Sequence, residues 1–185
     1  VGNSLTRIQA QEDLQRELAK RARIEAALRH RLAFEDLVTN VSTRLISLAP
    51  TQVDTAINDG LAAIGSFAGV DRVYVFWFRS DRILMDNTHE WCAPGIRPEI
   101  TTLQALPIDA TPWWMEKMRH SEVVHIPLVA ALPPEASAER AILTPQGIQS
   151  LLAVPMMIGQ EIVGFIGFDS VVTPKMWAED DIALL

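Results

Sequence analysis

The sequence predicts an α+β fold in which a central antiparallel β-sheet has helices on both sides and a long N-terminal helix of coiled-coil type precedes it. Three observations support this prediction. The first block of the chain is rich in helix-forming residues and contains no proline until Pro50, the hydrophobic period changes to two from Arg72 onward, and two pairs of strand-like segments are joined by short turns. We expect residues 1–33 to form a signalling helix and residues 34–185 to form one globular domain.

Composition and charge restrict the class of protein. The chain has 185 residues, of which 49% are hydrophobic, which suits one compact domain with an appendage. Its formal net charge is −7, and the acidic excess lies after residue 48, where eight Lys and Arg face seventeen Asp and Glu. An acidic domain repels phosphate backbones, so we expect no nucleic-acid partner.

Cysteine content and the absence of a long apolar run bear on the compartment. Cys92 is the single cysteine, so no intramolecular disulfide can form, and a reducing cytoplasm is the expected location. The longest apolar run, Leu151–Ile158, is too short to span a bilayer, and no secretory leader opens the chain. We expect no membrane insertion by this segment.

A leucine stripe on the N-terminal helix indicates a partner helix. Leucines at two positions four residues apart are repeated two heptads later, and Arg21 and Glu25 occupy the middle of the same seam. Polar seam residues weaken a coiled coil but can fix its register. We expect a homodimer through this seam; the alternative is a long helix that packs on its own domain. The seam leucines are Leu14, Leu18, Leu28 and Leu32.

The next segments predict the framework of the domain. Apolar residues stepping by three and four from Phe34 form a broader face that suits packing on a globular body, and Pro50 ends the helix. Thr51 is a good N-cap for a second helix, which runs to about Phe67 and is closed by Gly69.

The remainder alternates strands with loops and short helices. Arg72–Arg79 is apolar on both faces, so we expect a central strand, and Ile83–Cys92 returns from it as a hairpin. We expect Pro94–Pro112 to be mainly loop, and the last helix to be cut short at Leu185. The other expected elements are helices over Pro112–His120 and Glu135–Leu143, a strand over Val123–Leu128, and a hairpin of Ser150–Ile158 with Glu161–Val171 across Gly159–Gln160.

This order of elements, with these residues on it, resembles the GAF family. The matching segments together cover about Phe34 to Leu185, and the segment before them resembles the connector that leads from a PAS domain into a GAF domain. The segments are Phe34–Leu48 with Ser42 and Leu45, Asp71–Phe76, Asn87–Ile96, Gln146–Pro155, Gly164–Asp169 and Trp177–Asp181. The resemblance is to GAF domains of bacterial multidomain sensors of the histidine kinase or cyclic-di-GMP signalling type.

The resemblance implies a ligand pocket over the sheet. In this family the pocket binds small molecules, and the helices leading into and out of the domain relay occupancy to an effector. Loops over a sheet also make a concave site on physical grounds. Asn87, His89 and Trp91 alternate onto one face of a strand, and an arginine could hold an anionic ligand. The candidate pocket residues are Asn87, His89, Trp91, Trp113, Trp114 and Arg140; the tryptophans could instead be core residues.

Catalytic and metal chemistry are not predicted. Cys92 and His89 are three residues apart, which places them on opposite faces of a strand, and no glycine-rich phosphate loop is present. The spacing of His89, Cys92, His120 and His125 matches no zinc pattern. We therefore predict that the domain is not an enzyme and holds no metal.

The resemblance does not identify a cofactor. Bilin-binding members attach the chromophore through a cysteine, often followed by histidine, before the second hairpin; the segment Glu139–Gly147 contains neither residue, so a covalent bilin is not expected. Lys175, Trp177 and Asp181 match the cyclic-nucleotide signature only in part. The ligand stays open.

Three functional hypotheses follow. The first is a dimeric sensory domain that signals to a histidine kinase of a two-component system or to a diguanylate cyclase or phosphodiesterase. The second is a degenerate domain that acts only in dimerisation and as a spacer. The third is a small enzyme with Cys92 as its nucleophile.

Overall fold

The computed structural model describes residues 2–46, 48–177 and 182, and its elements follow the order α1–α2–β1–β2–β3–α3–β4–α4–β5–β6 with short 3₁₀ turns between them. The α+β class, the antiparallel sheet and the long N-terminal helix are as the sequence predicted. The bounds are α1 Gly2–Ile46, α2 Val53–Ala68, β1 Arg72–Phe78, β2 Leu84–Cys92, β3 Leu106–Pro107, α3 Pro112–Arg119, β4 Val124–Ile126, α4 Ser137–Leu143, β5 Ser150–Ile158 and β6 Glu161–Ser170.

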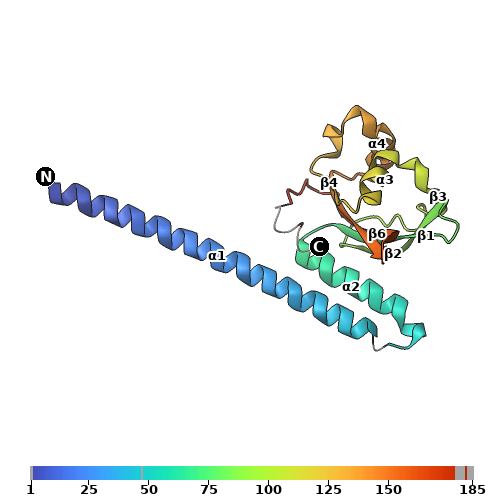
Figure 1. Ribbon diagram of the computed structural model, residues 1–185, viewed down its shortest axis with the longest axis horizontal. Helices are drawn as coiled ribbons and strands as arrows, with labels where there is room; N and C mark the ends of the chain where they lie inside the picture. The colour runs from blue at the N-terminus through green and yellow to red at the C-terminus, as the bar shows by residue number, and fades with distance from the viewer. Residues whose placement is uncertain (1, 47, 178–181, 183–185) are drawn as a thin grey trace. The chain divides into compact units, whose positions relative to one another are not determined.

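The chain divides into two compact units, Val1–Asn40 and Val41–Leu185. The first unit is part of the continuous helix α1, and its exposed surface carries i,i+4 ion pairs such as Arg21 with Glu17 and Arg29 with Glu25. None of the described helices is both long and apolar enough to cross a membrane. The second unit contains the sheet and the remaining helices (Figure 1).

The start of α2 differs from the sequence prediction. Thr51 lies inside a 3₁₀ turn, Pro50–Gln52, and α2 begins at Val53 with Gln52 as an N-cap that makes no side-chain capping bond. Proline at the first position of that turn keeps the chain helical from there, so the threonine does not reach the extended conformation that a cap requires. Gly69 closes α2 in the left-handed conformation, with φ of 63°, as predicted.

The sheet has six strands in the order β3-β2-β1-β6-β5-β4, and every neighbouring pair is antiparallel. β1 lies between β2 and β6, which confirms that it is central. β3 was not predicted: Leu106–Pro107 pairs with Leu84 and Met85 in a region that we expected to be loop. Two residues are too few to show a periodicity.

Each face of the sheet has its own hydrophobic core, because the central strands are apolar on both sides. On one face, Leu61 of α2 packs with Val73 and Phe168. On the other face, Trp114 and Met115 of α3 and Leu143 of α4 pack with Tyr74 and Phe165. α2 therefore covers one face, and α3 and α4 cover the other (Figure 1).

The predicted last helix falls largely on residues 178–181 and 183–185, which lie outside the described residues. Asp181, part of the partial cyclic-nucleotide signature, lies there too. Of that signature, Trp177 is buried in the core on the α2 side, and the Lys175 ammonium lies 4.9 Å from the centre of its ring.

Candidate functional site

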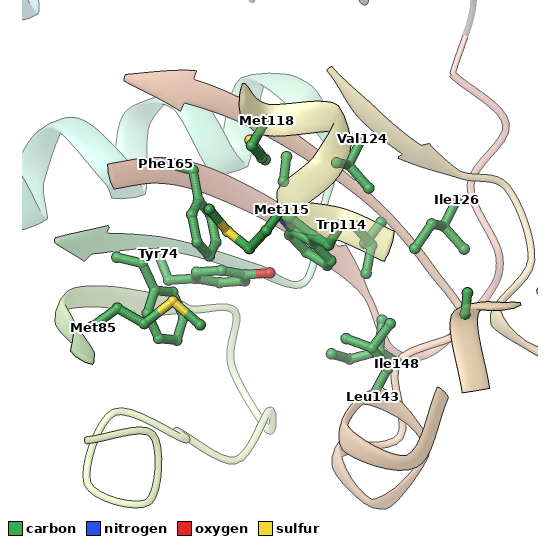
Figure 2. Packing of buried hydrophobic residues seen from close by; sticks show 14 of the residues in the cluster. Tyr74, Met85, Trp114, Met115, Met118, Val124, Ile126, Leu143, Ile148 and Phe165 are labelled. Carbon is green, nitrogen blue, oxygen red and sulfur yellow. The ribbon is translucent and has the colours of Figure 1, made fainter. Parts of the chain in front are cut away.

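A cavity of about 50 Å³ lies between the sheet and the helices α3 and α4. Its floor consists of aromatic residues of β1 and β6, and its roof includes Trp114 of α3 and Leu143 of α4. Figure 2 shows Trp114 beside Phe165 and close to Tyr74 in this layer. The other residues that line it are Phe76, Met85, Leu103, Leu106, Ala110, Thr111, Glu139, Ile142, Gln146 and Ile148.

The aromatic rings around the cavity hold one another in place. Phe76 stacks on Phe165 with ring centres 4.9 Å apart, and Trp114 is tilted against the same ring at 5.4 Å. Tyr74 meets Phe76 edge to face at 5.7 Å. Aromatic pairs in such arrangements contribute about 0.5–1.5 kcal/mol beyond their buried area. The cavity therefore has a rigid, flat and mainly apolar wall.

Two buried polar groups at the cavity lack hydrogen-bond partners within the described part of the chain. Glu139 is fully buried; its Oε1 accepts a hydrogen bond from the backbone N–H of Trp114 at 3.1 Å, and its Oε2 accepts none. The indole Nε1 of Trp114 is likewise unpartnered. Buried polar groups are normally satisfied, so each of these atoms requires an explanation.

The expectation that Asn87, His89 and Trp91 share one face of a strand is wrong. β2 carries a β-bulge at Thr88: Val75 pairs with His89 and Phe76 pairs with Asn87, so one extra residue lies between them. The bulge shifts the alternation by one, and it places Asn87 on the cavity face of the sheet with Glu90. His89 and Trp91 are on the α2 face instead.

Contacts agree with this placement. The His89 Nε2 lies 3.4 Å from Asp54 of α2, and Trp91 packs in the core on the α2 side. Asn87 is buried, and its Nδ2 donates to Glu90 at 3.3 Å. Whether any of the three binds a ligand stays a prediction, but His89 and Trp91 are not at the cavity.

Of the other candidate pocket residues, only Trp114 lines the cavity. Trp113 is half-buried, packs at the margin of the same core, and has the Lys117 ammonium 4.9 Å from the centre of its ring. Arg140 lies on α4 and donates to the backbone carbonyl of Leu132. Neighbouring residues of a helix point in different directions, and Glu139 points into the core, so Arg140 does not.

A buried charge network at one end of the strands β1, β2 and β6 was not predicted. Arg72 donates to Asp169 at 3.2 Å and to the backbone carbonyl of Arg97 at 3.0 Å, and it lies 3.7 Å from Glu90. Glu90 in turn accepts the backbone N–H groups of Glu99 and Ile100. The network ties β1, β2 and β6 to the loop that follows β2.

Burial controls the ionisation of this network. It raises the pKa of Asp169 to about 7, although Arg72 and Tyr74 act in the opposite direction. Burial and the neighbouring Asp169 raise the pKa of Tyr74 well above its ordinary value. Burial lowers the pKa of Arg72, but Asp169 and Glu90 outweigh it and raise the pKa above its usual value.

Cys92 lacks the features of an activated nucleophile. Burial raises the pKa of its thiol, and the negative charge of Glu90 adds to this, against a smaller opposite effect of Arg72. A reactive cysteine needs a lowered pKa. In the described ranges, no three His, Cys, Asp or Glu side chains gather closely enough to hold a metal ion.

The sequence could have indicated some of what it missed. Tyr74, Phe76 and Phe78 share one face of β1 by simple alternation. Ala136, Glu139 and Leu143 step by three and four, which brings them to one buried side of the short helical segment. An acidic residue at an inward helical position was the available signal for the cavity carboxylate.

An antiparallel six-stranded sheet with helices on both faces and a cavity over one of them defines the class of α+β domain to which this chain belongs. Residues 52–185 match the GAF domain family, and the chain belongs to that family. It is thus a GAF sensory domain.

Relatives extend the comparison. The chain is 31% identical over 170 residues to a methanogenesis regulatory histidine kinase of Methanothrix harundinacea; this match covers 90% of the chain but 18% of that kinase's length. Among solved structures, the phycocyanobilin-bound GAF domain of a cyanobacterial phytochrome is similar with a TM-score of 0.67 and 22% identity, over 82% of this chain and 86% of that one. The chromophore-binding domain of a bacteriophytochrome from R. palustris is similar with a TM-score of 0.66 and 16% identity, over 84% and 57%. These structural likenesses concern the fold.

Proposed function

We propose that this GAF domain is a non-catalytic sensor that binds a small molecule in the cavity beneath α3 and α4 and relays occupancy to an effector. A histidine kinase is the favoured effector, because the kinase relative shares 31% identity across 90% of the chain. A diguanylate cyclase or phosphodiesterase is the alternative effector. The single cysteine, with its raised pKa, agrees with a non-catalytic role in a reducing cytoplasm.

The observation that carries the proposal is that strands lining the cavity pack directly on α2 with their other face. Tyr74 and Phe76 of β1 line the cavity, while Val73 of the same strand and Trp91 of β2 belong to the core beneath α2. A side chain at Gly65 of α2 would collide with the Trp91 ring. A shift of these strands on ligand binding would therefore displace α2, because packed elements are not continuously deformable.

The last part of α1 continues this route. Within the second unit, a side chain at Gly60 of α2 would meet Val41 at 2.9 Å, and Arg44 lies 3.5 Å from Asp59. Displacement of α2 would thus reach the end of the long helix. The leucine seam would carry the change into a homodimer: Leu14, Leu18, Leu28 and Leu32 each expose more than half of their surface.

One observation favours a second candidate, a GAF domain that serves only in dimerisation and as a spacer. The cavity of about 50 Å³ is far smaller than a typical ligand pocket of roughly 300–1,000 Å³. Trp114 and Met85 take up space that a larger ligand would need. A sensor of this kind would have to bind a compact ligand or to open its cavity.

Hydrogen exchange with a ligand tests the proposal. Native mass spectrometry of freshly purified protein and a screen of small compounds supply the ligand. We expect binding to slow exchange in α3, α4, α2 and the last turns of α1. Ala110 lines the cavity, so A110F should abolish binding, whereas A130F at an exposed site should not. The absence of any ligand, or binding that leaves α2 unchanged, would favour the spacer role, and binding that survives A110F would show that the ligand is not in the cavity.

A further inference from the structure

The cavity carries information about the chemistry of its ligand. Its wall is almost entirely apolar and aromatic, so the body of a ligand must be apolar and flat. Its size limits that body to a compact ring. The polar atoms at the wall then decide which groups the ring carries.

Glu139 supplies an acceptor. Its side chain is fully buried, one oxygen is held by the backbone N–H of Trp114 at 3.1 Å, and the other has no partner among the residues that the structure describes. Among the described residues no cation forms an ion pair with Glu139, and a buried carboxylate oxygen without a donor is costly. A ligand N–H at this oxygen would remove that cost.

Trp114 supplies a donor. Its indole N–H is buried and unpartnered, and the same residue lines the cavity. Because the backbone N–H of Trp114 binds Glu139, the unpartnered Oε2 of Glu139 and the unpartnered indole N–H of Trp114 belong to two residues that are in contact at the cavity wall. One small molecule with an N–H and an acceptor atom on the same ring would satisfy both.

Building on the proposed sensor function, we propose that the cavity binds a compact, flat nitrogen heterocycle whose ring N–H donates to Glu139 and whose acceptor atom receives the indole N–H of Trp114. A hydrogen bond that satisfies a buried polar atom contributes enough for about a tenfold change in affinity. The selectivity of the site should therefore follow the donors of the ligand more than its apolar area.

Three five-membered rings of similar flat shape test this inference. Pyrazole has an N–H and an acceptor nitrogen, pyrrole has the N–H alone, and thiophene has no N–H. Dissociation constants from NMR titration of the whole chain should rise in that order, with about tenfold between pyrrole and thiophene.

Two variants identify the atoms. E139Q keeps an oxygen for the Trp114 backbone N–H but replaces the unpartnered oxygen with an N–H donor. The affinity for pyrrole should therefore fall to that for thiophene. E135Q, an exposed site nearby, should leave all three unchanged. W114F alters the cavity volume for every ring, so its readout is the ratio of pyrazole to pyrrole affinity, which should approach one. Urea unfolding of each variant establishes that it is folded.

The outcomes separate this inference from the proposed function. If all three rings bind equally to the wild type, or if E139Q does not change the preference for pyrrole, the ligand class is overturned while the cavity remains a binding site. If no ring binds and A110F changes nothing in any screen, both the ligand class and the sensor function are overturned.

Discussion

The Tyr74 hydroxyl donates a hydrogen bond to Asp169 at 3.0 Å, from β1 to β6. The tyrosine ring also lines the cavity, so one side chain touches both the ligand site and the buried charge network. A ligand that moves this ring would change the surroundings of Asp169 directly.

Replacing Asp169 with asparagine should change how stability depends on pH. Burial raises the pKa of Asp169 to about 7 in the folded chain, above the value of about 3.9 in an unfolded one. Between these values the folded state binds more protons, so this group lowers the free energy of unfolding as the pH rises, by at most about 1.4 kcal/mol per pH unit. D169N removes that slope. Urea unfolding of both proteins across this window measures it, and identical pH profiles would contradict the assignment.

An alanine at Gly167 should destabilise the domain. A Cβ there would collide with the ring of Tyr74, its partner in the sheet, and an aromatic ring between two packed layers cannot move aside. We expect G167A to lower the free energy of unfolding by about 1–3 kcal/mol or more. G159A is the control for backbone strain alone, because a Cβ at Gly159 meets open space and its φ of 63° costs about 1–2 kcal/mol, so G167A should lose more. Equal losses in the two variants, measured by urea unfolding, would contradict the collision.

Charges on the leucine seam should dissociate the proposed homodimer. In L18E/L28E, two carboxylates replace apolar seam residues in each helix, so we expect light scattering to give a monomer at micromolar concentration. A19E/A27E adds the same charge at exposed positions off the seam and should remain dimeric. A wild-type chain that is monomeric under these conditions would overturn the dimer.

Apolar residues at the centre of the seam should tighten the dimer. Arg21 and Glu25 interrupt the leucine stripe, and among the described residues they form exposed ion pairs within the helix, with Glu17 and Arg29. R21L/E25L would complete the seam, so the concentration at which the dimer dissociates should fall. Sedimentation equilibrium measures this concentration, and a rise would show that the two residues pair across the interface.

The Cys92 thiol should react slowly with thiol reagents at neutral pH. Burial raises its pKa, so less thiolate is present than in an unfolded chain. Denaturation in urea should therefore increase the rate of modification. Faster reaction in the folded protein would instead revive Cys92 as a nucleophile, and loss of ligand binding in C92S would point the same way.

Local signals predicted most of the fold. The hydrophobic periods of helices and strands predicted α1 and the four long strands. As expected, Gly69 ends α2 and Pro112 begins α3. The predicted start of α2 was wrong because Pro50 begins a 3₁₀ turn that includes Thr51, so this threonine cannot act as the N-cap. β3 was not predicted because its two residues form a strand by pairing with Leu84 and Met85, which are about twenty residues earlier in the sequence.

The candidate site was harder to predict, because it depends on long-range geometry. A single bulged residue places Asn87 and His89 on opposite faces of the sheet, where one shared face was expected. Nothing in the local sequence distinguishes Thr88 from a regular strand residue. Arg72 and Asp169 meet across 97 positions of sequence, so their pairing follows from strand order alone. Of the six predicted pocket residues, Trp114 lies at the cavity because α3 turns it inward.

Because Thr88 is the unpaired residue of the bulge, the rest of β2 does not depend on it for its pairing with β1. Thr88 is exposed, and its hydroxyl contacts the backbone carbonyl of Val75 and the ring Nδ1 of the neighbouring His89, so many residues could stand there. Deleting it would join Asn87 directly to His89 in regular alternation, so Asn87 would still pair with Phe76 on the cavity face. Among homologous sequences, substitutions and single-residue deletions at this position should therefore both be common.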